Sequence, residues 1–184
     1  MNLKKIFSLN KKKLKKISLL VLDVDGVLTD GGLFYDSNGE ILKRFDVRDG
    51  LGIKLLLENN IEVAFLSGGS SSSTTSRAEH LGVKYCFCKV KNKKIVLEKL
   101  MNNLNLKKNQ IAYVGDDLND LILRNNISLF ISPANADKAI KSKSNLTLQN
   151  KGGNGAVREI ADLILNAHNK LEKYKKSGWS DKND

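Results

Sequence analysis

The sequence contains few of the residues that mark linkers, disulfide frameworks or membrane spans. It has one proline and two cysteines among 184 residues, and only 6% of its residues are aromatic. Without a proline-rich linker, nothing in the composition separates two domains. No apolar run approaches the roughly 20 residues that cross a bilayer, and lysines interrupt the N-terminal apolar positions where a signal peptide would need them. We expect a single domain, residues 1–184, in the cytoplasm.

The two cysteines, Cys86 and Cys88, stand two positions apart in a short apolar run. This spacing does not provide the geometry of a disulfide between adjacent strands. No second pair of cysteines or histidines stands nearby to complete a zinc site. We interpret both residues as buried free thiols.

Acidic residues are fewer than basic ones: the sequence has 31 Lys and Arg residues and 20 Asp and Glu residues, for a net charge of +11. Such an excess favours anionic partners, whether a phosphorylated metabolite, nucleic acid or acidic lipid. Much of it lies in a basic lead-in, about residues 1–16, and a basic tail, about residues 172–184, without the aromatic residues that stack on bases. We interpret these ends as solvated and expect no nucleic-acid or membrane partner. A binding module driven by the lysines is the alternative.

Short apolar runs alternate with amphipathic stretches along the chain. The runs predict buried strands at residues 19–22, 61–66, 83–88, 111–114, 127–131 and 146–148. The intervening patterns predict helices at residues 51–58, 91–104, 118–125, 136–141 and 156–175, and another that ends near residue 81. This alternation indicates an α/β fold, a doubly wound, Rossmann-like parallel sheet with helices on both faces. Asn38-Gly39, between two β-favouring runs, predicts a small β-hairpin cap at about residues 32–46.

Polar, potentially reactive residues follow three of the predicted strands. Asp23 and Asp25 follow the first, Ser67-Gly68 another, and Gly115-Asp116-Asp117 a third, while Lys93 lies in the first turn of a helix. Open α/β sheets bind ligands at the edge where these strand ends meet. Paired carboxylates repel unless a cation compensates, and Mg²⁺ binds both carboxylate and phosphate oxygens. The pattern predicts metal-dependent phosphoryl chemistry. For the first pair by itself, an Asp-rich turn is the alternative.

These motifs resemble those of the haloacid dehalogenase superfamily of aspartate-nucleophile phosphotransferases. Residues 23–27 match its first motif, Ser67 its second, Lys93 its third, and residues 115–117 with Asp120 its fourth. Over residues 17–171 the chain is similar, more narrowly, to the 3-deoxy-D-manno-octulosonate 8-phosphate phosphatase family of lipopolysaccharide synthesis. That resemblance is carried by residues 23–31, 45–53, 112–120 and 152–159. It implies hydrolysis of this sugar acid phosphate through an aspartyl-phosphate. The alternatives are a related nine-carbon acylneuraminate-type sugar phosphate and a non-catalytic assembly subunit.

The resemblance also implies roles for individual residues. Asp23 is the expected nucleophile and Asp25 the expected acid and base, with Mg²⁺ held by Asp23, Asp116 and the backbone carbonyl of Asp25. The expected phosphate-binding groups are Ser67, Gly68 and Lys93, and the residues expected to support the metal and its water ligands are Asp117 and Asp120.

The sequence departs from the family at Gly69, where an arginine is usual. Arg77 matches another basic position of the family, and Arg48 is a further candidate for substrate binding, although a salt bridge with Asp46 or Asp49 is an equal alternative for it. The family assembles as a homotetramer in which neighbours close each other's sites. We therefore expect an anionic sugar phosphate substrate and sites near subunit interfaces.

Overall fold

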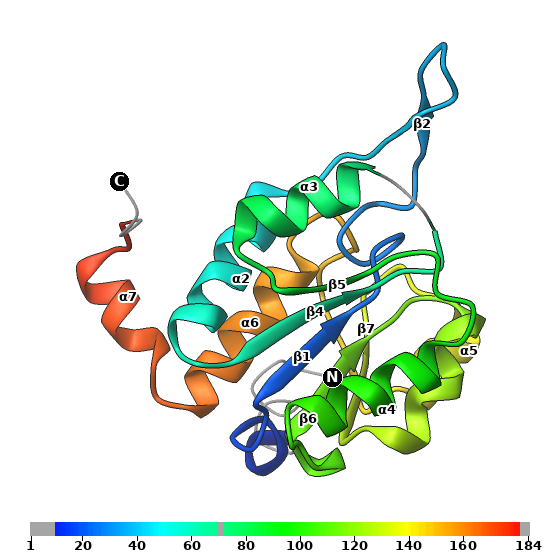
Figure 1. Cartoon of the computed structure of the whole chain (residues 1–184). Coiled ribbons are helices and arrows are strands. Elements are labelled where there is room, and N and C mark those ends of the chain that lie inside the picture. The colour runs from blue at the N-terminus through cyan, green and yellow to red at the C-terminus, as the bar shows by residue number, and fades with distance from the viewer. Residues whose placement is uncertain (1–9, 70–71, 181–184) are drawn as a thin grey trace.

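A parallel sheet lies at the centre of the computed structural model, which describes residues 10–69 and 72–180 (Figure 1). The strands are β1 (Leu19–Leu22), β4 (Glu62–Leu66), β5 (Tyr85–Phe87), β6 (Ile111–Val114), β7 (Leu129–Ser132) and β8 (Leu146–Thr147). Their order is β5-β4-β1-β6-β7-β8, and every neighbouring pair is parallel. The predicted doubly wound α/β fold is confirmed.

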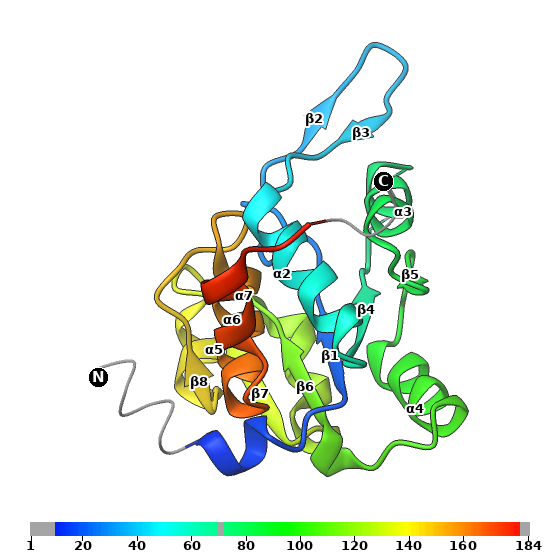
Figure 2. The same ribbon diagram turned by 90° about the vertical axis from the view of Figure 1, so that its left-hand side faces the viewer.

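Both faces of the sheet are buried, which explains the unbroken apolar runs of its strands. Leu20 and Leu22 of β1 pack in the core beneath one layer of helices, and Leu19 and Val21 pack in the core on the other side. The first layer comprises α2 (Val47–Glu58), α3 (Ser72–Leu81) and α6 (Ala156–Ala167). The second comprises α4 (Lys93–Asn103), the 3₁₀ helix η2 (Leu118–Asn126) and α5 (Lys138–Lys143) (Figure 2). A 3₁₀ turn, η1 (Lys108–Gln110), leads into β6.

The strand order reverses around β1, and this places the ends of three strands side by side. Leu22, the last residue of β1, pairs with Phe65 of β4 and with Val114 of β6. The segments that follow these strands therefore leave the sheet at one edge, the position at which doubly wound folds bind ligands.

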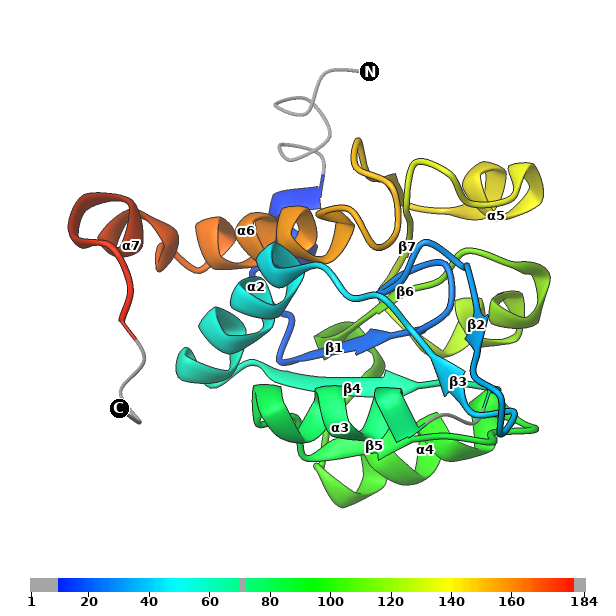
Figure 3. The same ribbon diagram turned by 90° about the horizontal axis from the view of Figure 1, so that it is seen from above.

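A hairpin stands over this edge, as predicted from Asn38-Gly39. Its strands are β2 (Phe34–Tyr35) and β3 (Ile41–Leu42), which lie beyond the carboxyl ends of β1 and β4 (Figure 3). Gly39 adopts a left-handed φ of +79°, and the Asp36 carboxylate accepts hydrogen bonds from the backbone N–H groups of Asn38 and Glu40.

The expected helix at residues 156–175 is two helices. α6 ends at Ala167, and α7 (Leu171–Ser177) begins after Asn169, whose φ of +58° is incompatible with a continuous helix. The expected basic tail also makes specific contacts up to residue 180. Tyr174 Oη and Trp179 Nε1 donate hydrogen bonds to the Glu58 carboxylate at 2.9 and 2.7 Å.

The described part of the basic lead-in, residues 10–16, begins with helical residues 10–14, and Leu14 and Ile17 are fully buried beneath the sheet. Among the described residues, no helix combines the length and the apolar character needed to cross a membrane. Cys86 and Cys88 are free thiols, as expected, but both are half-buried.

A buried carboxylate joins α2 to α6. Asp49 is 1% exposed and accepts hydrogen bonds from the backbone N–H groups of Arg158 at 2.7 Å and Gly155 at 3.3 Å. Because Gly155 lacks a side chain, Asp49 supplies the N-terminal cap of α6. Burial raises the pKa of the Asp49 carboxyl to about 6, against the opposing effect of these N–H donors.

This raised pKa predicts a pH dependence of stability. A carboxyl whose pKa rises from 3.8 to about 6 on folding contributes stability below about pH 4, and this contribution is lost as the pH rises through 6. Asp49→Asn removes the titration. Urea denaturation gives the free energy of unfolding of both proteins. We expect the difference, wild type minus Asp49→Asn, to fall by at most about 3 kcal/mol between about pH 4 and pH 7.

Glu79→Gln, an exposed carboxylate of α3, is the control for charge removal on the surface. A difference between wild type and Asp49→Asn that stays constant across this pH range contradicts the prediction.

Candidate active site

A cleft of about 380 Å³ opens at the edge of the sheet where β1, β4 and β6 end. Its lining residues are Asp23, Asp25, Gly26, Gly31, Gly68, Gly69, Asp116, Asp117 and Asn119. The cleft therefore brings together residues that stand far apart in the sequence and that were selected as site candidates.

One buried lysine links two of the acidic groups. Lys93, 4% exposed, lies with its Nζ 2.9 Å from Asp23 Oδ1 and 2.6 Å from Asp120 Oδ1. It is the first residue of α4, a helix that starts there because the Asn92 side chain accepts hydrogen bonds from the N–H groups of Lys94 and Ile95. Tyr113 Oη lies 3.1 Å from Lys93 Nζ and also donates to Asp120 Oδ1.

The carboxylates of this group are difficult to ionise together. Burial, followed by repulsion from Asp120, raises the pKa of Asp23 to about 6 even though Lys93 opposes the shift. Burial and the charges of Asp23 and Asp120 raise the pKa of Asp116 to about 7. Burial opposes the charge on Lys93, but Asp23 and Asp120 outweigh it and raise the pKa of Lys93 above its ordinary value. The site is short of positive charge.

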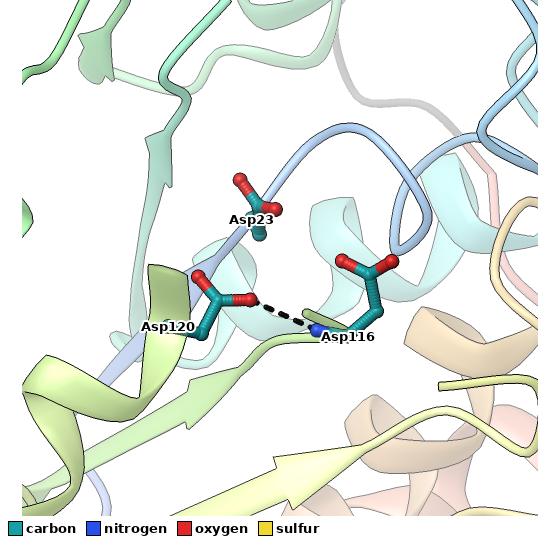
Figure 4. A group of neighbouring side chains, drawn as sticks. All are labelled: Asp23, Asp116 and Asp120. Carbon is teal, nitrogen blue, oxygen red and sulfur yellow. Dashed lines mark hydrogen bonds between the residues drawn. The ribbon is translucent and has the colours of Figure 1, made fainter. Parts of the chain in front are cut away.

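A divalent cation fits this arrangement. Asp23, Asp116 and Asp120 each offer an oxygen atom within 4.8 Å of the others (Figure 4). Both oxygens of Asp120 are occupied, one by Lys93 and Tyr113 and the other by the backbone N–H of Asp116 at 2.9 Å. Asp116 Oδ1 is buried and has no hydrogen-bond partner. Carboxylates gathered this closely favour a cation such as Mg²⁺ that compensates their repulsion, and Asp23 and Asp116 are the ones available to hold it.

Gly26 makes room for the Asp116 carboxylate. A Cβ at position 26 would lie 2.0 Å from Asp116 Oδ2, and the φ of +85° at Gly26 is left-handed. The glycine that follows Asp25 therefore permits both the turn and the close approach of Asp116.

The loop after β4 supplies a second wall of the cleft. Ser67 is 1% exposed, and its Oγ accepts a hydrogen bond from the N–H of Gly69 at 3.1 Å. Gly68 and Gly69 line the cleft. Backbone N–H groups in such a turn can bind anionic oxygens.

Two predicted substrate-binding arginines do not line this cleft. Arg48 Nη2 lies 2.7 Å from Asp46 Oδ2 and 2.8 Å from Asn154 Oδ1. Arg77 Nη2 donates to the carbonyl oxygen of Asp46 at 3.3 Å. The described chain therefore directs both guanidinium groups to Asp46, the salt-bridge alternative that the sequence left open for Arg48.

Lys43 and Tyr113 also contact the acidic residues, although no motif of the sequence points to them. Lys43 Nζ lies 2.7 and 2.9 Å from the two oxygens of Asp25, although hairpin lysines ordinarily extend into solvent. Tyr113 was classed only as a core strand residue. Its period-two spacing with Gly115, beside the acidic loop, is a signal that could have identified it.

The parallel sheet, its switch point at β1 and the Asp23–Asp116–Lys93 group define a haloacid dehalogenase-like hydrolase, and the profile of that family matches residues 40–123. The 3-deoxy-D-manno-octulosonate 8-phosphate phosphatase KdsC of Salmonella typhi is 40% identical over 163 residues, 89% of this chain and 87% of its own length. The chain belongs to the 3-deoxy-D-manno-octulosonate 8-phosphate phosphatase family.

Solved structures agree. The phosphatase of Moraxella catarrhalis, in complex with magnesium ion, phosphate ion and KDO, has a TM-score of 0.89 at 34% identity and covers 97% of this chain and 100% of its own. The cobalt-bound phosphatase of Haemophilus influenzae has a TM-score of 0.85 at 41% identity, with 88% and 95% coverage.

Two adjacent glycines, Gly152 and Gly153, allow the segment before α6 to pack closely against the loop after β1. A Cβ at Gly152 would lie 1.8 Å from the carbonyl oxygen of Gly26, and one at Gly153 would lie 2.4 Å from the backbone nitrogen of Asp30. The N–H of Gly153 donates to the carbonyl of Val27 at 3.0 Å. The loop after β1 therefore packs directly against the backbone of Gly152 and Gly153.

We expect Gly152→Ala to destabilise the fold by roughly 2–3 kcal/mol or more, because the methyl group has to displace backbone atoms. Gly82→Ala is the matched control, since a Cβ there meets no atom within 4 Å although φ is +74°. Gly82→Ala should lower the free energy of unfolding, measured with denaturant, by only about 1–2 kcal/mol. Equal losses in the two variants contradict the assigned contact.

Magnesium should stabilise the protein through Asp116. At a concentration about 100 times its Kd, a ligand that binds only the folded state adds about 2.7 kcal/mol. We expect Mg²⁺ to raise the melting temperature of the wild type and to leave that of Asp116→Asn nearly unchanged. Asp36→Asn, on the hairpin, should respond like the wild type. An undiminished Mg²⁺ response in Asp116→Asn contradicts the ligand assignment.

Proposed function

We propose that this protein is a Mg²⁺-dependent phosphatase that hydrolyses 3-deoxy-D-manno-octulosonate 8-phosphate to the free sugar acid and phosphate. One observation carries the proposal. Asp23 lines the cleft, paired with Lys93 and within 4.8 Å of the available Asp116 carboxylate. The Moraxella catarrhalis relative, which binds magnesium, phosphate and KDO, supports the choice of cofactor and substrate.

Asp23 is the proposed nucleophile. When bound at Asp23, Asp116 and the backbone carbonyl of Asp25, Mg²⁺ supplies positive charge that reduces repulsion between carboxylate and phosphate. Lys93 adds a fixed charge and orients the Asp23 carboxylate through its 2.9 Å contact. One oxygen of Asp23 then attacks phosphorus, and the bond between phosphorus and the sugar oxygen breaks.

Asp25 is the proposed acid and base. It lines the cleft two residues after Asp23, so it can give a proton to the leaving sugar oxygen and later take one from water. Ser67 and the backbone N–H groups of residues 68–69 would bind the phosphate oxygens. Asp120 holds Lys93 and the Asp116 backbone in place, and Asp117, which begins η2, lies beside the metal-binding carboxylate.

We further propose a homotetramer that works in the cytoplasm, with sites near its interfaces. Large side chains on the hairpin support such an assembly, since Phe34, Tyr35 and Leu42 are 61%, 65% and 51% exposed. A neighbouring copy seated there would bring further groups towards the cleft. Arg48 and Arg77 then stay candidates for the substrate's carboxylate across an interface.

Phosphate release tests the proposal. With Mg²⁺ present, the purified protein should hydrolyse 3-deoxy-D-manno-octulosonate 8-phosphate faster than a nine-carbon acylneuraminate-type phosphate and far faster than hexose phosphates. Asp23→Asn should lower kcat by roughly 10³- to 10⁶-fold while the protein stays folded, because no other group there can form the covalent intermediate.

Glu79→Gln, an exposed carboxylate of α3, is the control for loss of a carboxylate. A folded wild type that releases no phosphate from any of these esters would point to the non-catalytic assembly subunit. Near-normal rates in Asp23→Asn would exclude this nucleophile.

A further inference from the structure

A buried lysine of the hairpin holds the proposed acid–base residue. Lys43 Nζ lies 2.7 Å from Asp25 Oδ1 and 2.9 Å from Asp25 Oδ2. The Lys43 side chain is 2% exposed, whereas that of Asp25 is 36% exposed and lines the cleft. Lys43 is not among the residues that line the cleft, so it acts on the chemistry through Asp25.

The surroundings leave room for this pair and hold it in place. A Cβ at Gly69 would lie 3.2 Å from Asp25 Oδ2 and 3.9 Å from Lys43 Nζ, so the bare backbone at this position accommodates the contact. Two residues before Lys43, the carbonyl of Ile41 accepts a hydrogen bond from Ser73 Oγ of α3 at 2.9 Å. The hairpin leg that carries Lys43 is thus anchored beside the cleft.

We propose that Lys43 is a positioning residue for the second half of the reaction, hydrolysis of the aspartyl-phosphate. This inference rests on the proposed function. The contact of Lys43 with both oxygens restricts rotation of the Asp25 carboxylate. This contact holds the Asp25 oxygens beside the cleft, where the proton of the attacking water is to be accepted. The hairpin cap therefore contributes to catalysis from within the same chain.

The step that Lys43 supports needs no reactant other than water. The oxygen of a water molecule attacks phosphorus while one of its protons passes to Asp25. The bond between phosphorus and the Asp23 oxygen breaks, and its electron pair returns to the Asp23 carboxylate. Inorganic phosphate leaves, and Asp25 keeps the proton that it can give to the next leaving group.

Loss of Lys43 should slow this step more than the first one. Lys43→Met keeps much of the buried stem but removes the ammonium group, so Asp25 loses its orientation. We expect kcat to fall roughly 10- to 100-fold, less than the 10²- to 10⁴-fold that a general base itself contributes. Phosphorylated enzyme should accumulate, because its formation continues while its hydrolysis is delayed.

The experiment is an acid quench of the full-length protein during turnover of 3-deoxy-D-manno-octulosonate 8-phosphate with Mg²⁺. Hydroxylamine-labile phosphate bound to protein is counted together with released phosphate. Lys43→Arg should restore kcat and a low level of phosphorylated enzyme. Arg44→Met, the neighbouring exposed cation on the same hairpin leg, should match the wild type.

A raised fraction of phosphorylated enzyme in Lys43→Met, with lowered kcat, supports the inference. Wild-type kcat in this variant overturns it. A lowered kcat with no rise in phosphorylated enzyme also overturns it, because a structural defect or an effect on the first step would give that result. A wild type that releases no phosphate overturns the proposed function instead, and the inference with it.

Discussion

The repulsion between carboxylates gathered in one buried place is the constraint on which the rest of this structure depends. Asp23, Asp116 and Asp120 offer oxygens within 4.8 Å of one another, and burial with mutual repulsion raises the pKa values of Asp23 and Asp116 to about 6 and 7. Lys93 compensates part of this charge, between Asp23 and Asp120. The remaining deficit of positive charge makes the cleft a suitable place for a divalent cation. When bound, such a cation would reduce the repulsion between a phosphate ester and the carboxylates.

Closely packed backbone holds these carboxylates together. Parallel pairing of β1 with β4 and β6 sets the three acidic and polar loops next to each other. Glycines then allow these loops to approach more closely than a Cβ permits, at Gly26 against Asp116 and at Gly152 against Gly26. Close backbone contact and the buried Lys93 together hold the carboxylates of Asp23 and Asp116 in place.

The hairpin is more than a cover for the cleft. Phe34, Tyr35 and Leu42 of the hairpin are exposed, while its Lys43 side chain is buried against Asp25. In the proposed mechanism and assembly, this one small insertion therefore serves both contact with another copy and acid–base chemistry. A family arginine is missing at position 69, and the glycine found there gives space to this internal pair.

Local pattern was enough to predict the sheet, the hairpin and the candidates Asp23, Asp25, Ser67, Lys93 and Asp116, because apolar periodicity and polar strand ends are properties of neighbouring residues. The break after α6 escaped prediction, since helical periodicity continues across Asn169 and only the left-handed φ there interrupts it. Pairings between distant segments required tertiary structure. The contact of Lys43 with Asp25, the part of Tyr113 in holding Asp120 and the turning of Arg77 towards the Asp46 carbonyl join residues whose mutual distance no local pattern encodes.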